Sequence, residues 1–426
     1  MAVFLSKNDE QMLGGQCGDA AKLAMSILVR MAEVYEAPEL MDVSQAHIDG
    51  CALMCDSGLE FAEKLVALNA RVSVPTTLNM IPLDLQNWER LGIPEEFATK
   101  ATRIAKAYTD MGCIPTWTCA PYQGYLTPRF GQQIAWGESN AIVYANSVLG
   151  ARTNRYGDYM DICAAITGRV PKSGLHLKEN RKGQSLFRLV DIQPQLMRDD
   201  TLYVALGHFI GGLFQEGIPV IEGLPASATN DQFKALGAAA AASGDVALFH
   251  AIGVTPEANT LKEAFQGEVP KSVISICFSD LRRAWLDLST AEEGAELDVV
   301  VLGCPHFSYE EFQRLARIVE EEQGRLPHPG VRVLVLTSQT SYALLQRGGL
   351  MDTLLGFGVE IILDTCVFHS PIISANAKVI MTNSGKCAYY APGELSIQVA
   401  FGSMRDCIRS AIEGAVCWEK TAWKES

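Results

Sequence analysis

Long apolar runs are missing from this chain of 426 residues, in which no stretch approaches the roughly 20 apolar residues that cross a bilayer. Residues 1–10 have neither the basic nor the apolar region of a secretory signal peptide. The sequence also contains no internal repeat, low-complexity segment or Pro/Ser-rich linker. These absences predict a protein of the cytoplasm or an organelle matrix, with no membrane partner.

Basic residues are in deficit. The chain has 35 Lys and Arg against 49 Asp and Glu, a formal charge of −14 and a pI near 5.0. Proteins that bind phosphate backbones over a broad surface need a surplus of Lys and Arg, so we expect no nucleic-acid partner. Apolar residues make up 48% of the chain, which is enough for more than one core.

The pattern of apolar residues favours an α/β fold. Residues 9–36 predict one long helix, residues 58–68 a second, and residues 70–75 a strand that ends at Pro75. After about residue 200, short β-rich runs alternate with helical stretches at 309–322 and 341–348, and several runs are apolar on both faces, as buried parallel strands are. Strands are expected at 218–221, 246–250, 272–276, 297–302, 331–336, 359–363 and 377–381. The alternation predicts α/β layers with parallel sheets, divided into residues 1–200, 201–295 and 296–426.

Residues 130–200 are rich in Asn, Ser, Thr and Arg, interleaved with Ala, Val and Gly. Such neutral hydrogen-bonding groups, together with Arg, suit a cavity for a small polar or carboxylate ligand, because a guanidinium matches a carboxylate in shape. The alternative is that these polar groups satisfy buried backbone between helices.

Twelve cysteines are more than an ordinary cytosolic chain carries, yet no Cys-x-x-Cys is present. Parallel sheets bind ligands at the carboxyl ends of their strands. Cys304 and Cys366 directly follow predicted strands, and Cys119 lies in a loop flanked by prolines. These three thiols could share a zinc ion or an iron–sulfur cluster, one could be a lone nucleophile, or all could be unrelated loop thiols, because their spacing matches no compact metal motif. The other nine cysteines are expected to pack as small apolar side chains.

Seven short strings occur in the order in which a known family carries them, over nearly the whole chain. They are His-Ile-Asp-Gly at 47–50, Val-Pro-Thr-Thr-Leu-Asn at 74–79, Thr-Cys-Ala-Pro-Tyr at 118–122, Ala-Asn-Ser-Val-Leu-Gly-Ala-Arg-Thr-Asn at 145–154, Gly-Cys-Pro-His at 303–306, Asp-Thr-Cys at 364–366 and Thr-Asn-Ser-Gly-Lys at 382–386. On these strings the chain resembles aconitase X, the divergent branch of the aconitase superfamily. The resemblance implies an aconitase-like fold, with several α/β layers around a central iron–sulfur cluster cleft.

The resemblance also implies an iron–sulfur hydro-lyase that dehydrates a small hydroxy acid. Its cluster ligands fall on Cys119, Cys304 and Cys366, with the nuclearity left open. Catalytic roles are expected for Lys386, Ser384 and His47, while Glu138 is a candidate base or a structural orienter. The residues expected to bind substrate are Thr76, Thr77, Asn79, Ser139, Asn140, Asn146, Arg152 and Asn383.

Two substrates fit the family. Bacterial members dehydrate cis-3-hydroxy-L-proline to pyrroline-2-carboxylate, and residues 155–165 and 174–181 favour that branch. Archaeal two-subunit members dehydrate mevalonate 5-phosphate. The family's complete unit also includes a small swivelling domain with an active-site serine, for which this sequence leaves no room, so a separate small-subunit partner is expected. A cluster-less scaffold subunit that binds a carboxylate is the non-enzymatic alternative.

Overall fold

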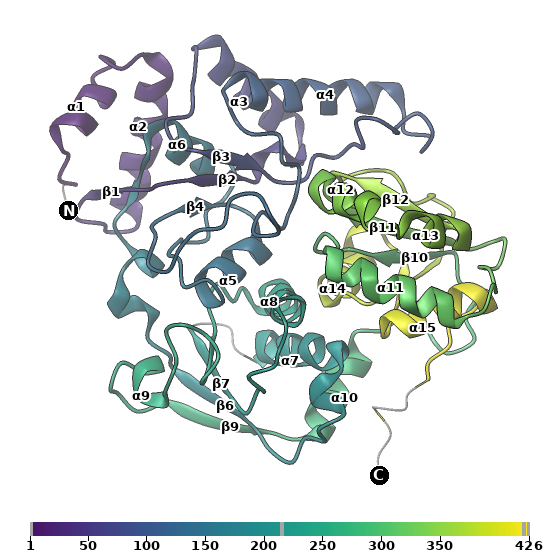
Figure 1. Ribbon diagram of the computed structural model, residues 1–426. Coiled ribbons are helices and arrows are strands. Elements are labelled where there is room, and N and C mark those ends of the chain that lie inside the picture. The colour runs from purple at the N-terminus through teal and green to yellow at the C-terminus, as the bar shows by residue number, and fades with distance from the viewer. Residues whose placement is uncertain (1–2, 214–216, 420–422, 424–426) are drawn as a thin grey trace. The chain divides into compact units, whose positions relative to one another are not determined.

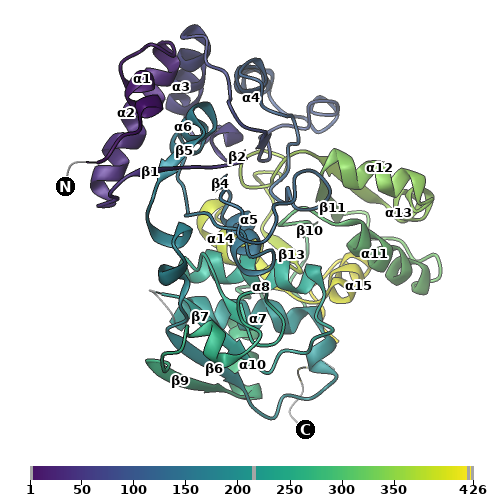
Figure 2. The same cartoon turned by 60° about the vertical axis from the view of Figure 1, so that its left-hand side comes forward.

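The computed structural model describes residues 3–213, 217–419 and 423. The chain divides into two compact units, residues 1–182 and 183–426, which are described separately below (Figures 1 and 2). The division into three parts at residues 200 and 295 stays a prediction. Within the described ranges, no helix combines the length and the apolar character needed to cross a membrane.

The first unit packs helices around a small parallel sheet with the strand order β3-β2-β4, and β1 pairs with β5 in an antiparallel ladder. Its main core contains fully buried side chains from α2, α3, α4 and α6, among them Leu28, Leu65 and Ile104. The helices are α1 (Lys7–Leu13), α2 (Asp19–Val34), α3 (Asp56–Ala67), α4 (Glu95–Asp110), α5 (Ser139–Ser147) and α6 (Met160–Thr167). The strands are β1 (Leu40–Asp42), β2 (Ala46–Ile48), β3 (Thr76–Leu78), β4 (Ala135–Trp136) and β5 (Arg169–Pro171).

Two of the N-terminal predictions are wrong. The single helix predicted over residues 9–36 is two helices, because Gly15 and Gly18 adopt left-handed backbone angles, with φ of 86° and 95°, that no helix continues through. The strand predicted at 70–75 is absent, and β3 begins after Pro75. The helix predicted at 58–68 is confirmed as α3.

The second unit contains two parallel sheets, with strand orders β8-β7-β6-β9 and β12-β11-β10-β13-β14. The predicted α/β class with parallel sheets is therefore confirmed. The strands are β6 (Ser185–Leu189), β7 (Pro219–Glu222), β8 (His250–Ala251), β9 (Ser272–Ile276), β10 (Val299–Leu302), β11 (Arg332–Thr337), β12 (Val359–Leu363), β13 (Val379–Thr382) and β14 (Gln398–Phe401). The helices are α7 (Asp200–Leu213), α8 (Asn230–Gly244), α9 (Leu261–Ala264), α10 (Phe278–Asp287), α11 (Tyr309–Glu321), α12 (Gln339–Arg347), α13 (Met351–Phe357), α14 (Gly385–Glu394) and α15 (Met404–Glu413).

The late strands and both late helices lie where they were predicted, with one exception. Residues 246–250 form no strand before His250, although Val246, Leu248 and Phe249 are buried. An apolar run indicates burial but not strand pairing, and here the buried residues before His250 pair with no neighbouring strand. The strands β6 and β14 were not predicted.

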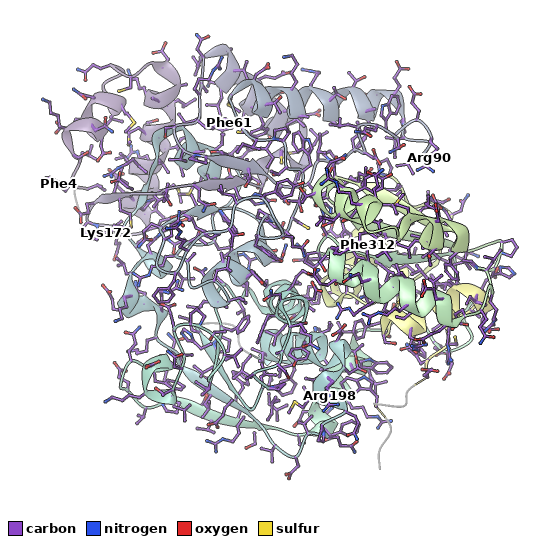
Figure 3. All side chains as sticks on the ribbon, in the orientation of Figure 1. Phe4, Phe61, Arg90, Lys172, Arg198 and Phe312 are labelled. Atoms are coloured by element: carbon purple, nitrogen blue, oxygen red, sulfur yellow. The ribbon has the colours of Figure 1, made fainter. Side chains whose placement is uncertain are left out.

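Close helix packing brings the loop after β10 next to α8 and α14. α7 packs along α8, and α8 packs against α14. Gly207 of α7 lies so near α8 that a Cβ there would sit 2.3 Å from the Leu236 carbonyl oxygen. On the other side of the loop, Phe312 of α11 (labelled in Figure 3) meets Phe307 edge to face, with ring centroids 5.1 Å apart. The loop after β10 is thus packed from both sides.

Candidate active site

The two strand-end cysteines of the second unit lie at the same edge of one sheet. Cys304 is the second residue after β10 and Cys366 the third after β12, and both strands pair with β11 in a wholly parallel sheet. Gly303, at the turn, has φ of 91°, and a Cβ on it would lie 2.1 Å from the Leu336 carbonyl oxygen of β11. Only glycine fits this position, and it turns the chain so that the half-buried Cys304 stands just beyond the strand.

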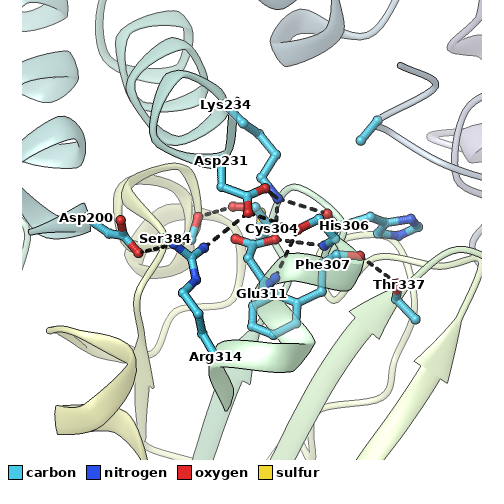
Figure 4. A network of polar contacts seen from close by, with 12 residues as sticks. Asp200, Asp231, Lys234, Cys304, His306, Phe307, Glu311, Arg314, Thr337 and Ser384 are labelled. Carbon is cyan, nitrogen blue, oxygen red and sulfur yellow. Dashed lines mark hydrogen bonds and ion pairs between the residues drawn. The ribbon is translucent and has the colours of Figure 1, made fainter. Parts of the chain in front are cut away.

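Side chains from several elements hold the segment from Cys304 to Ser308 (Figure 4). The Ser384 hydroxyl donates to the carbonyl of Cys304, and the Thr337 hydroxyl donates to the carbonyl of Phe307 at 2.8 Å. Nε2 of His306 donates to the carbonyl of Thr365 at 2.9 Å. Because Thr365 precedes Cys366, the His306 ring ties the two cysteine loops together.

A third thiol, Cys387, lies in the first turn of α14. It is fully buried, and burial raises its pKa well above the ordinary value, with further increases from Cys304 and then Cys366. Both strand-end thiols are therefore within electrostatic reach of one buried sulfur. Cys387 itself is a packing residue of α14, whereas Cys304 and Cys366 are half exposed.

The structure brings the predicted residues Asn383, Ser384 and Lys386 to the start of α14, after β13 of the same sheet. Ser384 is the N-cap: its hydroxyl oxygen accepts from the Cys387 backbone amide at 3.0 Å while its proton goes to the carbonyl of Cys304. Asn383 and Lys386 are half-buried, and Asn383 lines a small cavity that Cys304 also lines. The Ser384 hydroxyl is thus engaged as a scaffold group at the edge that carries the cysteines.

In the first unit, His47 and Thr77 are paired across β2 and β3, with His47 Nδ1 2.8 Å from the Thr77 hydroxyl. The imidazole is completely buried and lies 5.8 Å from the Trp136 ring. Burial lowers the pKa of His47 to about 3, against a smaller opposite effect of Glu138. The ring is therefore neutral at physiological pH and has no imidazolium proton to donate there.

Next to this pair, a buried network surrounds the carboxylate of Glu138, the N-cap of α5. The carboxylate accepts from Ser139 Oγ at 3.1 Å, from Asn140 Nδ2 at 2.8 Å and from Asn79 Nδ2 at 3.2 Å. Asn140 also donates to the carbonyl of Cys119 at 2.9 Å. The structure thereby assembles three predicted substrate residues and the Cys119 loop around one carboxylate, which favours Glu138 as an orienter.

Two other predicted residues, Thr76 and Asn146, are held by scaffold contacts. The Thr76 hydroxyl donates to the Val74 carbonyl at 2.8 Å. The amide of Asn146 pairs with the backbone of Thr153, and Arg181 donates to it at 3.0 Å. Arg152 is half-buried, and its positive charge helps to lower the pKa of His176. Among the contacts described for these residues, none joins Arg152 to the Glu138 network. Their substrate roles stay predictions.

Sequence reasoning missed several polar residues around these sites. Tyr122, inside one of the matching strings, donates to Asn140 Oδ1 at 2.9 Å. Asp49 accepts from Asn79 Nδ2. A buried cluster of charged residues behind Cys304, which includes Lys234 and Glu311, gave no signal in the sequence except that Lys234 interrupts a mainly apolar buried helix face.

Three of the nine remaining cysteines, Cys17, Cys55 and Cys277, are exposed, so the expectation that all nine are packed is wrong.

The donor set suits a thiophilic metal group only in part. Cys304 and Cys366 provide soft sulfur ligands at one sheet edge, and the buried hydroxyl of Thr365, in the Cys366 loop, has no hydrogen-bond partner. Cys119 belongs to the first unit. Across the described residues, no group of three or more His, Cys, Asp or Glu side chains is gathered closely enough to hold a metal ion. The second unit thus supplies two fitting ligands and not a complete set.

The fold and these strand-end groups define an α/β protein with polar side chains at the carboxyl ends of parallel strands, and comparison with known proteins gives its family. Family models for the first, second and third domains of aconitase X match residues 2–179, 184–286 and 297–413. A crystal structure titled aconitase X (holo-form), from Thermococcus kodakaraensis, superposes with a TM-score of 0.86 at 32% identity, covering 96% of this chain and 100% of that one. The chain belongs to the aconitase X family, so the predicted family and aconitase-like fold are confirmed.

Two kinds of relative share this family. A cis-3-hydroxy-L-proline dehydratase from Pseudomonas aeruginosa is 43% identical over 97% of this chain and 71% of its own length. The corresponding enzyme from Hypocrea jecorina is 42% identical, with coverages of 97% and 69%. A phosphomevalonate dehydratase large subunit from Methanocaldococcus jannaschii is 36% identical over 96% of this chain and 100% of its own length. Each of these relatives is named as a dehydratase, which is a hydro-lyase.

Proposed function

We propose that this chain is the large catalytic part of a hydro-lyase that dehydrates cis-3-hydroxy-L-proline to pyrroline-2-carboxylate. The observation that carries the proposal is the 43% and 42% identity, over nearly the whole chain, to two enzymes named for this substrate. The buried amides and hydroxyls around Glu138 are consistent with a small, polar, carboxylate-bearing ligand.

Cys119, Cys304 and Cys366 would hold an iron–sulfur cluster. A cluster with three protein ligands supplies a Lewis-acidic iron for the leaving hydroxyl. The part-exposed state of Cys304 and Cys366, compared with the buried Cys387, supports their assignment as ligands, since a ligand sulfur must be reachable.

The chain's own residues would bind the substrate and move its proton. Asn383 and the amides of Asn79 and Asn140 are candidates to hold the carboxylate. Lys386 is our candidate for the group that takes the proton next to the carboxylate, because it stands in the first turn of α14, two residues after Ser384, whose hydroxyl bonds the Cys304 carbonyl. Ser384 would position this turn, since its hydroxyl already bonds the Cys304 carbonyl and the Cys387 amide.

The second candidate function is that of a phosphomevalonate dehydratase large subunit. It is favoured by one observation: the Methanocaldococcus jannaschii large subunit is 36% identical over 96% of this chain. The word "subunit" in that name supports a partner that completes the site, and we propose a small swivelling-domain polypeptide as this partner.

The test is anaerobic purification followed by iron and sulfide analysis and by mass-spectrometric detection of water loss from each substrate. Both substrates are offered to the chain alone and to the chain with a candidate small subunit. Turnover of hydroxyproline supports the proposal. Turnover of phosphomevalonate alone establishes the second candidate, and bound iron and sulfide absent under all conditions would leave the cluster-less scaffold.

A further inference from the structure

Behind the Cys304 loop lies a buried lysine that the proposed reaction does not use. Lys234 of α8 has a side chain only 3% exposed. Its ammonium group contacts the Glu311 carboxylate of α11, lies 3.4 Å from Asp231 Oδ1, and donates to the carbonyl of His306 at 3.3 Å. These acceptors engage the ammonium group, so Lys234 is placed to hold structure.

The acceptors of Lys234 lead directly to the cysteine loop. Glu311 also accepts from the Ser308 backbone amide at 2.8 Å, and the Ser308 hydroxyl donates to Asp231 at 3.0 Å. Lys234, Glu311 and Asp231 therefore bind the segment of residues 306–308 from the side of α8 and α11 (Figure 4). On its other side, the same segment is held by Thr337.

One small cavity is lined both by this charged cluster and by Cys304. A cavity of about 30 Å³, large enough for about one water molecule, is lined by Lys234, Glu311, Cys304 and Ser384. Loss of the lysine contact would leave the carbonyl of His306 without this donor, two residues from Cys304 and next to a void into which the loop can relax.

We propose that Lys234 is a positioning residue for Cys304, acting through the His306 carbonyl and the Glu311–Ser308 contact. Lys234 lies in the part matched by the second aconitase X domain model, and Cys304 in the part matched by the third. The second domain would thus set the position of a ligand that belongs to the third. This inference rests on the proposed role of Cys304 as a cluster ligand.

Stabilisation of the fold alone does not explain the presence of the buried Lys234–Glu311 ion pair. A buried ion pair is often replaceable by uncharged side chains of similar volume without loss of stability, whereas removing one partner leaves an unpaired buried charge. The informative variant is therefore the double change Lys234→Met with Glu311→Gln. The side-chain carbonyl introduced by Glu311→Gln can still accept from the Ser308 amide, so the helix cap survives while the bond from Lys234 to His306 is lost.

The matched control is Arg332→Met with Glu360→Gln. This pair joins β11 and β12 of the same sheet, but Arg332 stands at the start of β11, away from its carboxyl end, and its guanidinium makes two bonds of 2.8 and 2.9 Å to Glu360. The control double variant removes one positive and one negative charge, as the test variant does, but changes no contact of residues 304–308.

Two readouts are taken on the full chain. In cluster-free protein, isotope-coded alkylation and peptide mapping give the labelling rates of Cys304 and Cys366. In reconstituted protein, the half-time of iron loss to a chelator gives ligand retention. For the Lys234/Glu311 variant we expect at least a threefold change in the Cys304 rate and at least a threefold shorter half-time. The Cys366 rate in this variant, and the Cys304 rate in the control, should stay near those of the parent chain.

Unchanged Cys304 labelling in a variant that unfolds at the parental temperature would overturn the inference. If the Met-containing variant does not fold, Lys234→Gln with Glu311→Gln replaces the ion pair by two uncharged amides and removes the ammonium donor to His306, and the same change is expected. If the parent chain binds no iron, the proposed cluster fails, and the labelling rates still decide whether Lys234 positions Cys304.

Discussion

The closest backbone approach at the candidate site gives a sharp prediction for Gly303. An L-residue in the left-handed region, as φ of 91° requires, costs roughly 1–2 kcal/mol. An alanine Cβ would also lie 2.1 Å from the Leu336 carbonyl oxygen, far inside van der Waals contact, and that oxygen already accepts from the Phe307 amide at 3.0 Å. Forcing such strands apart costs about a further 1–3 kcal/mol. Gly303→Ala should therefore destabilise the second unit by about 2–5 kcal/mol.

The chain offers a matched control in Gly324, which has φ of 84° with nothing within 4 Å of an added Cβ. Gly324→Ala should lose only the backbone cost, roughly 1–2 kcal/mol. Calorimetric unfolding of both variants measures the difference, at roughly 2–4 °C of Tm per kcal/mol for a unit of this size. Gly303→Ala should also lose iron on reconstitution. Equal Tm losses in the two variants would refute the close approach of β10 and β11.

Three further predictions follow from other contacts. His176 donates from Nδ1 to Gln133 at 2.7 Å and accepts from the Tyr156 hydroxyl at 2.5 Å, and burial lowers its pKa to about 3. Its contribution to the free energy of unfolding is therefore present above pH 6.5 and is lost as the pH falls toward 3, by up to about 1.4 kcal/mol per pH unit. In urea titrations at pH 7.5 and 5.5, the free energy of unfolding should fall less between the two pH values for His176→Gln than for the parent chain. An equal fall in both contradicts the assignment. Cys366→Ala should abolish reconstituted iron–sulfur absorbance while the exposed Cys17→Ala retains it, and the reverse pattern removes Cys366 from the ligand set. Ser384→Ala should lower the free energy of unfolding by about 1 kcal/mol through loss of the α14 cap, whereas an unchanged Tm would indicate that this hydroxyl has no scaffold role.

The late part of the fold could be predicted because its strands are continuous apolar runs. β10 and β12 are almost wholly buried, and a sequence such as Val-Val-Val-Leu is typical of a buried parallel strand. β6 escaped prediction because its last residues, Arg188 and Leu189, are exposed or half-buried, which breaks the apolar pattern. The region 246–250 shows the opposite error, since buried apolar residues there pair with no strand before His250.

The candidate site was predictable where chemistry and strand ends coincide, and not where contacts are distant in sequence. Cys304 and Cys366 could be selected by position alone, because parallel strands place their following residues at one sheet edge. Lys234 could not, since its partner Glu311 is 77 residues away and neither residue lies in a recognisable string. Ser384 was predicted as catalytic, and only the structure shows that its hydroxyl already bonds the backbone on both sides.

Exposure by itself does not identify the ligand thiols. Cys17, Cys55 and Cys277 are more exposed than Cys304 and Cys366, yet Cys55 and Cys277 stand as isolated N-cap residues of α3 and α10. What distinguishes Cys304 and Cys366 is that their loops share a sheet edge and are joined through the His306 ring. A pair of sulfur atoms that must bind one group needs its separation fixed before the group arrives, because ordering the loops afterwards would reduce affinity. The dense hydrogen bonding of residues 304–308 is what the proposed ligand role of Cys304 requires.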